Sequence, residues 1–268
     1  MRNLIRADVY KIVRGKALYI TFAVLFVMVI LNVTTGMAMI TLVAEDGGVM
    51  APLGIEIYGE TDGFVSAVIA VFSSMEQLVF VLLSFVMLVS VPIFSNGTVK
   101  NDIARGVSRT KLYLSKLIVC GVLCVLMYLA YVGLGILSYV IVNGFGSPVP
   151  AGFWLTLIQA VGAQLFILLA VTCFGLFLVF TTKRSGMVIG IYIAFFLLPT
   201  MLLNLLSLFH PDLALTLVNL DMTTSIGRLG FINQLEIREI LTILGIGAGY
   251  ILASTTFGLA SFRKAEIK

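Results

Sequence analysis

Six long apolar stretches are the feature of this sequence that most limits what it can fold into. They cover residues 17–43, 64–94, 112–142, 153–181, 187–208 and 240–262. Each reaches or exceeds the ~20 residues that a helix needs to cross the hydrocarbon core of a bilayer. Hydrophobic residues make up 60% of the chain and charged residues only 11%, which excludes an ordinary soluble domain. The sequence therefore predicts an all-α integral membrane protein with six transmembrane helices.

The apolar stretches and their connections occupy nearly the whole chain. We therefore expect residues 1–268 to form a single transmembrane domain without a separate soluble part. The phosphate-binding pattern G-x-x-x-x-G-K-[ST] is absent. If the protein needs energy, we expect it to come from another polypeptide or from an ion gradient.

Basic residues are distributed asymmetrically along the chain. With the N-terminus placed inside, all of the 17 Lys and Arg residues except Arg228 and Arg238 fall on the inner side. The positive-inside rule then places both termini in the cytoplasm. The basic composition reflects membrane topology, so we expect membrane lipids as surroundings and no nucleic-acid partner.

Residues 1–16 combine basic side chains with apolar ones at helical spacing. The apolar positions are Leu4, Ile5, Val9, Ile12 and Val13. This pattern predicts an amphipathic interfacial helix on the cytoplasmic leaflet. The alternative is a short basic topology signal without defined structure.

The connection at residues 95–111 is the one sizeable cytoplasmic segment. We expect Thr98 to cap a short helix over 99–105 and Gly106 to end it. The charged residues of this helix are Lys100, Asp102 and Arg105, and its apolar face has Val99 and Ile103. Such a segment could transmit movement from a soluble partner into the helices on either side, or it could be a simple basic loop that satisfies topology.

Residue types that carry out chemistry are scarce. The single histidine, His210, stands beside Pro211 at an outer boundary, and the three cysteines fall in apolar stretches without a nearby histidine. The patterns H-E-x-x-H and G-x-S-x-G are absent. We therefore expect no catalytic residue, no metal site and no cofactor in this chain.

A few polar side chains fall inside the apolar stretches and could line a pathway or form a gate. They are Glu76, Gln77, Gln159, Gln164 and Asn204. A charge at bilayer depth is expensive enough to suggest function, although Glu76 could also lie at the outer interface. The uncharged residues could instead make hydrogen bonds between helices. Ion-coupled carriers usually need several buried ionisable groups, and the apolar stretches of this chain offer only one glutamate, so we consider such a carrier less favoured.

Two further patterns concern packing. The outer segment 209–239 is rich in leucine, which predicts that it dips into or lies along the outer leaflet. G-x-x-x-G spacings occur at Gly186–Gly190 and Gly245–Gly249. Small residues at this spacing let helices approach closely, either within the bundle or between two copies of the chain.

Together these features resemble the permease subunit of ABC-2-type ABC transporters. The resemblance covers the basic N-terminal stretch, the six spans with both ends inside, the apolar outer segment and a motif after the second span. In the family this motif runs E-x-x-x-G-T, a short helix, S-R, and then a lysine that enters the third span. The matching residues are Gly97, Thr98, Ser108, Arg109 and Lys116. Phe94, Ser95 and Asn96 stand where the family usually has an acidic residue.

The resemblance implies a subunit of an ATP-driven exporter in a bacterial-type plasma membrane. A second permease chain, identical or a sister subunit, would complete the pathway. A cytoplasmic ABC ATPase dimer would bind ATP and Mg and dock on the 95–111 segment. The residues implied in this coupling are Thr98, Lys100, Asp102, Ile103, Arg105, Ser108 and Arg109. The substrate would be amphiphilic, such as a lipid-like molecule or a peptide antibiotic to which the exporter confers immunity.

Two other classes of function stay open at this point. One is an ion-coupled secondary transporter or channel that uses Glu76 and needs no ATPase. The other is a membrane enzyme, or a non-transporting assembly or immunity protein.

Overall fold

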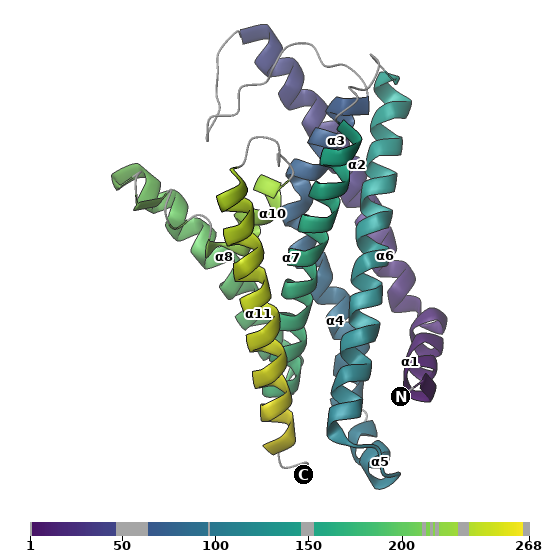
Figure 1. Cartoon of the computed structure of the whole chain (residues 1–268). Coiled ribbons are helices and arrows are strands. Elements are labelled where there is room, and N and C mark those ends of the chain that lie inside the picture. Colours follow the sequence, from purple (N-terminus) through teal and green to yellow (C-terminus); the bar gives the residue numbers. More distant parts are fainter. Residues whose placement is uncertain are drawn as a thin grey trace.

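The computed structural model describes residues 2–46, 64–95, 97–145, 153–210, 213–214, 217, 220–229 and 236–264. Every regular element in these ranges is a helix, and the helices form an elongated bundle (Figure 1). Five helices are long and apolar enough to cross a membrane, and a bent pair at the N-terminus makes a sixth when it is counted as one span. The chain is therefore a multi-pass membrane protein, as its sequence predicts.

The long helices lie close to the predicted spans. They are α2 (Lys16–Asp46), α6 (Arg109–Asn143), α7 (Phe153–Thr182), α8 (Ser185–Phe209) and α11 (Ile237–Lys264). A single turn-like break at residues 183–184 separates α7 from α8. The predicted outer connection at 44–63 lies mostly outside the described residues.

The second predicted span is broken in the structure. Residues 64–94 were expected to form one helix, but they divide into α3 (Phe64–Ser73), the 3-10 turn η1 (Ser74–Gln77) and α4 (Leu78–Ser95). Only Ser74–Phe94 qualifies as a membrane span. The Ser74 hydroxyl donates to the Val71 carbonyl at 3.0 Å, a local bond that competes with the regular helical pattern. The expectation of one unbroken helix was therefore wrong.

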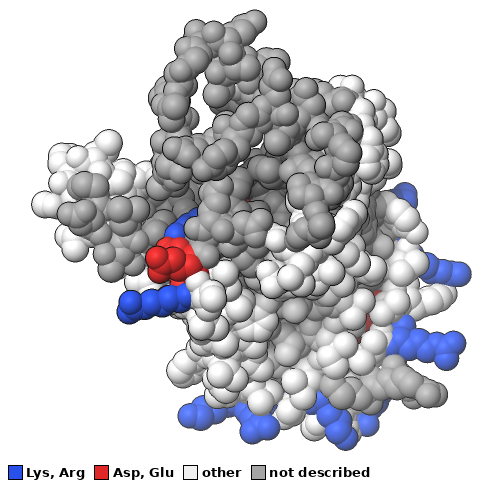
Figure 2. Space-filling view, turned by 45° about the horizontal axis from the view of Figure 1, so that its top comes forward, with Lys and Arg blue, Asp and Glu red and all other residues white. Residues whose placement is uncertain are grey.

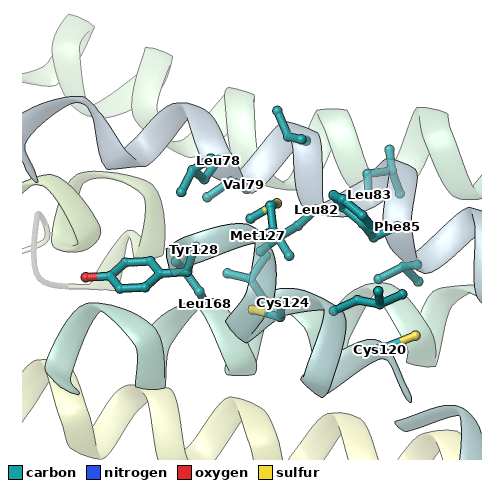
Figure 3. Close-up of a cluster of buried hydrophobic side chains, with 14 of the residues drawn as sticks. Leu78, Val79, Leu82, Leu83, Phe85, Cys120, Cys124, Met127, Tyr128 and Leu168 are labelled. Carbon is teal, nitrogen blue, oxygen red and sulfur yellow. The ribbon is translucent and has the colours of Figure 1, made fainter. Parts of the chain in front are cut away.

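The core lies where α4, α6 and α7 meet, and Figure 3 shows part of it. Leu78 and Phe85 of α4 pack with Met127 of α6 and Leu168 of α7, and all four are buried. About 67% of the most apolar part of α7 is buried, against 17% for α8 and for α11. The helix α7 is therefore central, whereas α8 and α11 leave most of their surface for lipid. In Figure 1, α8 leans away from the other helices.

The helix α1 (Arg2–Arg14) precedes α2 and meets it at Gly15, with a bend of 64°. Its residues Asp8 and Ile12 face the bundle, whereas Val9 and Val13 are about half exposed. The predicted apolar face is thus divided between the protein and its surroundings. Exposed apolar side chains such as Val9 and Val13 suit a helix that lies against a membrane surface.

Both termini lie at the same end of the bundle as the short helix α5 (Thr98–Ala104), and we call this the basic end (Figure 1). Side-chain bonds tie the elements together here. Lys116 of α6 is buried and its Nζ lies 2.6 Å from Oδ1 of Asp8 in α1. Arg109 Nη1 donates to the carbonyls of Arg263, at 2.6 Å, and Phe262, at 3.2 Å, in α11. The base of α6 therefore joins the two ends of the chain.

The described part of the 209–239 segment includes α10 (Met222–Leu229), which packs against α3, η1, α7, α8 and α11. Met222, Ile226 and Leu229 are buried. This short helix therefore fills space inside the bundle.

The four glycines of the predicted G-x-x-x-G spacings do not pack within the chain. A Cβ atom added at Gly186, Gly190, Gly245 or Gly249 would meet nothing within 4 Å. The close approaches of α11 occur at Gly247 and Gly258, where a Cβ would lie 2.6 Å from Ile167 Cδ1 and 2.5 Å from Tyr113 Oη. Packing within the bundle was thus the wrong interpretation of those spacings, and contact between copies stays a prediction.

Candidate functional site

The helix α5 lies between α4 and α6 at the basic end, where the sequence predicts a coupling segment. It follows Gly97, whose φ of +63° lies in the left-handed region that suits glycine. Thr98 was expected to cap this helix, but it is the first helical residue. Its hydroxyl donates to the Ile93 carbonyl of α4 at 3.3 Å, and no side chain caps α5. The hydroxyl thus ties the helix to the end of α4.

The helix α5 ends at Ala104 with Arg105 as its C-cap, and Gly106 stops it in the next position, as the sequence predicts. Gly106 has a φ of +83°, and its N–H donates to the Ile103 carbonyl at 2.9 Å. The Val107 N–H donates to the Asp102 carbonyl at 3.1 Å. These paired bonds satisfy carbonyls that the last helical turn leaves without partners. Two backbone hydrogen bonds therefore fix the turn after α5.

The two faces of α5 differ in what they contact. Val99 is 3% exposed and Ile103 packs against the core. Lys100 and Arg105 are exposed, and Asp102 is half-buried. The helix is therefore anchored by its apolar face and presents a charged face at the end of the bundle, as the sequence predicts for this segment.

The next two predicted coupling residues have structural partners. Ser108 is the N-cap of α6, and its Oγ accepts from the Lys111 N–H at 3.4 Å. Arg109 contacts the last turn of α11, where carbonyl groups carry partial negative charge. Ser108 therefore begins α6 directly after the turn that follows α5, and Arg109 ties α6 to α11.

A cluster of uncharged polar groups lies inside the bundle and includes Gln77. The amides of Asn32 in α2 and Gln77 in η1 bond reciprocally at 2.9 and 3.0 Å. Asn32 Nδ2 also lies 3.2 Å from Tyr131 Oη, which lies 3.0 Å from Ser74 Oγ. Sequence reasoning missed Asn32 and Tyr131. The lone Asn in the apolar stretch 17–43 was the available signal for the first.

A groove of about 440 Å³ adjoins this polar cluster between α2 and the η1–α4 segment. Its lining residues are Ile20, Thr21, Val24, Met28, Gln77, Phe80, Val81 and Ser84. The walls are apolar except for Thr21, Gln77 and Ser84. Such a lining can hold hydrocarbon and also hydrogen-bond polar groups, which is what an amphiphilic molecule requires.

Glu76 stands in η1, beside Gln77, and its side chain is half-buried. The neighbouring element on one side is α10, which packs against η1. Glu76 therefore lies at the break in the second span, toward the end of the bundle opposite the basic end.

The other predicted pathway residues are not gathered in one place. Gln159 and Asn204 are exposed on α7 and α8. Gln164 is fully buried, donates to the carbonyls of Phe72, at 3.1 Å, and Ile226, at 2.9 Å, and accepts from Tyr128 Oη at 3.2 Å. These bonds join α7 to α6, α3 and α10. For Gln164 the alternative interpretation, hydrogen bonds between helices, is therefore the one that the structure supports.

In the face that Figure 2 shows, Lys and Arg side chains lie along the lower edge, along the right edge and beside an acidic patch at the left, and the described surface between them is uncharged. Within the described ranges, no three His, Cys, Asp or Glu side chains lie close enough together to hold a metal ion. The three cysteines are buried thiols. No protein-family model matches this chain, and no curated protein sequence is similar to it.

Proposed function

We propose that this chain is the membrane-spanning permease subunit of an ATP-driven exporter of the ABC-2 type. The observation that carries the proposal is α5, a two-turn helix held by its apolar face with charged residues turned outward at the basic end. A cytoplasmic ABC ATPase dimer, which binds ATP and Mg, would dock on this face. The basic end would then be cytoplasmic, in agreement with the positive-inside rule.

The contacts of α5 support a route for movement. A force on α5 reaches α4 through the Thr98–Ile93 bond and buried Val99. It reaches α6 through the short turn that ends at Ser108, and α11 through Arg109. The pair of Asp8 and Lys116 extends the route to α1. Because these links are hydrogen-bonded or buried, small movements at α5 are passed on to several spans.

The groove between α2 and α4 is the surface of this chain that we propose for the pathway. Its uncharged polar groups suit an amphiphilic substrate such as a peptide antibiotic or a lipid-like molecule. A second permease chain, identical or a sister subunit, would close the open side of the groove. The assembly would lie in a bacterial-type plasma membrane with both termini in the cytoplasm.

The test is recovery of the partner ATPase with the purified chain in mild detergent, followed by mass spectrometry. Replacement of residues 98–106 by a Gly/Ser linker should abolish recovery of a protein with a G-x-x-x-x-G-K-[ST] motif. The double change Lys100→Glu and Arg105→Glu should weaken recovery at least tenfold without unfolding the chain. Arg184→Glu is the matched control, since Arg184 is exposed in the turn between α7 and α8.

A preparation without any ATPase, from cells in which the function is active, would sink this proposal. The position of Glu76 at a break in a span favours a second candidate, an ion-coupled carrier or channel, because carriers often place ion sites at broken helices. Under that alternative, Glu76→Gln abolishes transport and no nucleotide is consumed.

A further inference from the structure

A second cavity lies away from the groove, between the outer half of α8 and the segment that contains α10. It has a volume of about 260 Å³, close to the lower end of small-molecule pockets, which begin near ~300 Å³. Its lining is apolar except at Asp221 and Tyr250, and includes Phe195, Pro199, Leu202 and Leu206. Neighbouring residues of α8, such as Leu205 and Leu208, are mostly exposed. The cavity is therefore next to a surface that faces lipid.

Asp221 stands at this cavity with 6% of its surface exposed. Its Oδ2 accepts from Thr200 Oγ1 of α8 at 2.8 Å, and its two oxygens also accept from the N–H groups of Thr223 and Thr224 at 3.2 and 3.4 Å. Thr224 Oγ1 donates at 3.2 Å. All of these donors are neutral. The two ion pairs found among the described residues join other side chains, so no basic group of that part of the chain lies within ion-pair distance of Asp221.

Hydrogen bonds from neutral groups and the N-terminal end of α10 stabilise the buried Asp221 carboxylate, but no cation of the described residues lies within ion-pair distance to neutralise its charge. Capping of α10 explains the backbone bonds, but an asparagine or a serine would cap equally well without a buried charge. The additional bond from Thr200 holds the carboxylate at the wall of the cavity. An occupant with an ammonium group and a hydrocarbon chain would complement both the charge and the lining.

We propose that this cavity binds a cationic amphiphile, with its ammonium group at Asp221 and its hydrocarbon part along Leu202 and Leu206. This deepens the proposed function by naming a substrate class, and it rests on that function only for the statement that the bound molecule is exported. Binding itself needs no ATPase. A failure here is thus distinguishable from a failure to recover the ATPase.

The experiment measures binding of tritiated dodecyltrimethylammonium to the full chain in phosphatidylcholine nanodiscs, with empty nanodiscs as the reference for partition into lipid. Saturable binding above the empty nanodiscs is expected. Asp221→Asn should weaken it at least about tenfold, because one partner of a buried charge pair is removed. Asparagine keeps the capping bonds, so α10 should stay folded.

Two tryptophan variants separate the cavity from the surface of α8. Leu206→Trp fills the cavity and should abolish saturable binding, whereas Leu205→Trp, on the exposed face of the same helix, should leave it unchanged. Uncharged dodecanol should compete at least tenfold more weakly than unlabelled probe. Equal competition by dodecanol, equal affinity of Asp221→Asn, or no saturable binding to the unaltered chain would each overturn the inference.

Discussion

Replacement of Gln164 by leucine should destabilise the bundle through lost hydrogen bonds rather than through a cavity, because the two side chains are similar in size. Gln164 is fully buried and makes three bonds, to Tyr128 Oη and to the carbonyls of Phe72 and Ile226. Both carbonyls belong to the last turns of short helices, where the helix itself supplies no donor. The substitution leaves them without a partner.

The magnitude follows from the membrane setting. Side-chain hydrogen bonds between helices in a bilayer contribute about 0.6 kcal/mol each, because the unfolded chain also finds partners there. Three such bonds give about 2 kcal/mol, which is a factor of about 30 in the folding equilibrium. In a water-soluble protein, a single buried polar group without a partner costs about 1–3 kcal/mol. About 2 kcal/mol is therefore a lower bound for the loss of all three hydrogen bonds of Gln164.

The assay is reversible unfolding in mixed micelles, combined with hydrogen exchange at the amides of α10. Gln164→Leu should lower the free energy of unfolding by about 2 kcal/mol and speed exchange over Met222–Leu229. Gln159→Leu is the matched control, since Gln159 is exposed on the same helix. If the two variants unfold alike, or if exchange in α10 is unchanged, Gln164 does not anchor α10 and the reasoning fails.

Three further predictions concern the basic end and the glycines. Lys116→Met should destabilise the chain by about 3–5 kcal/mol, because it leaves the Asp8 carboxylate without its partner. The double change Asp8→Leu with Lys116→Met should recover much of this stability. A thermal unfolding experiment in which the double variant is no more stable than the single one would contradict the prediction. Gly258→Ala should lower the free energy of unfolding by about 1–3 kcal/mol, because the added carbon meets Tyr113. Gly249→Ala should be neutral or stabilising, because a carbon added there meets nothing. Equal unfolding midpoints for the two variants in a thermal scan would refute this difference. Arg109→Ala should increase proteolysis after Arg263 and leave the central helices intact, because the bonds from Arg109 to the last turn of α11 are lost. An unchanged cleavage rate would show that Arg109 does not hold this turn in place.

The sequence predicted the spans well because each one is a continuous apolar run, and the need to satisfy backbone hydrogen bonds in lipid makes such a run helical. The ends of α6, α7 and α11 lie within a few residues of the expected bounds. The break at Ser74–Gln77 was missed, because apolar residues continue on both sides of it. Two bonds accompany the break: a local one from the Ser74 hydroxyl to the Val71 carbonyl, and one from Gln164, a residue far away in the sequence, to the Phe72 carbonyl.

The candidate site was predictable only in part. The C-terminal limit and the apolar face of α5 follow from Gly106 and from the spacing of Val99 and Ile103, which are local signals, whereas Thr98 was wrongly expected to cap the helix. The pathway residues were chosen because they are polar within apolar runs, and this criterion says nothing about which face of a helix they occupy. It therefore placed exposed Gln159 in the same group as buried Gln164.

Composition and local pattern by themselves determined that this is a helical, multi-pass membrane protein with a short charged helix between its second and third spans, because hydrophobic length and turn signals act over a few residues. The tertiary structure alone decided which polar groups meet. The pairing of Asn32 with Gln77 spans 45 positions, that of Asp8 with Lys116 spans 108, and Asp221 reaches the cavity only through the packing of α10 beside α8. Such contacts depend on how the helices pack. Because every span must be apolar to cross the bilayer, hydrophobicity alone does not indicate which faces of the helices meet.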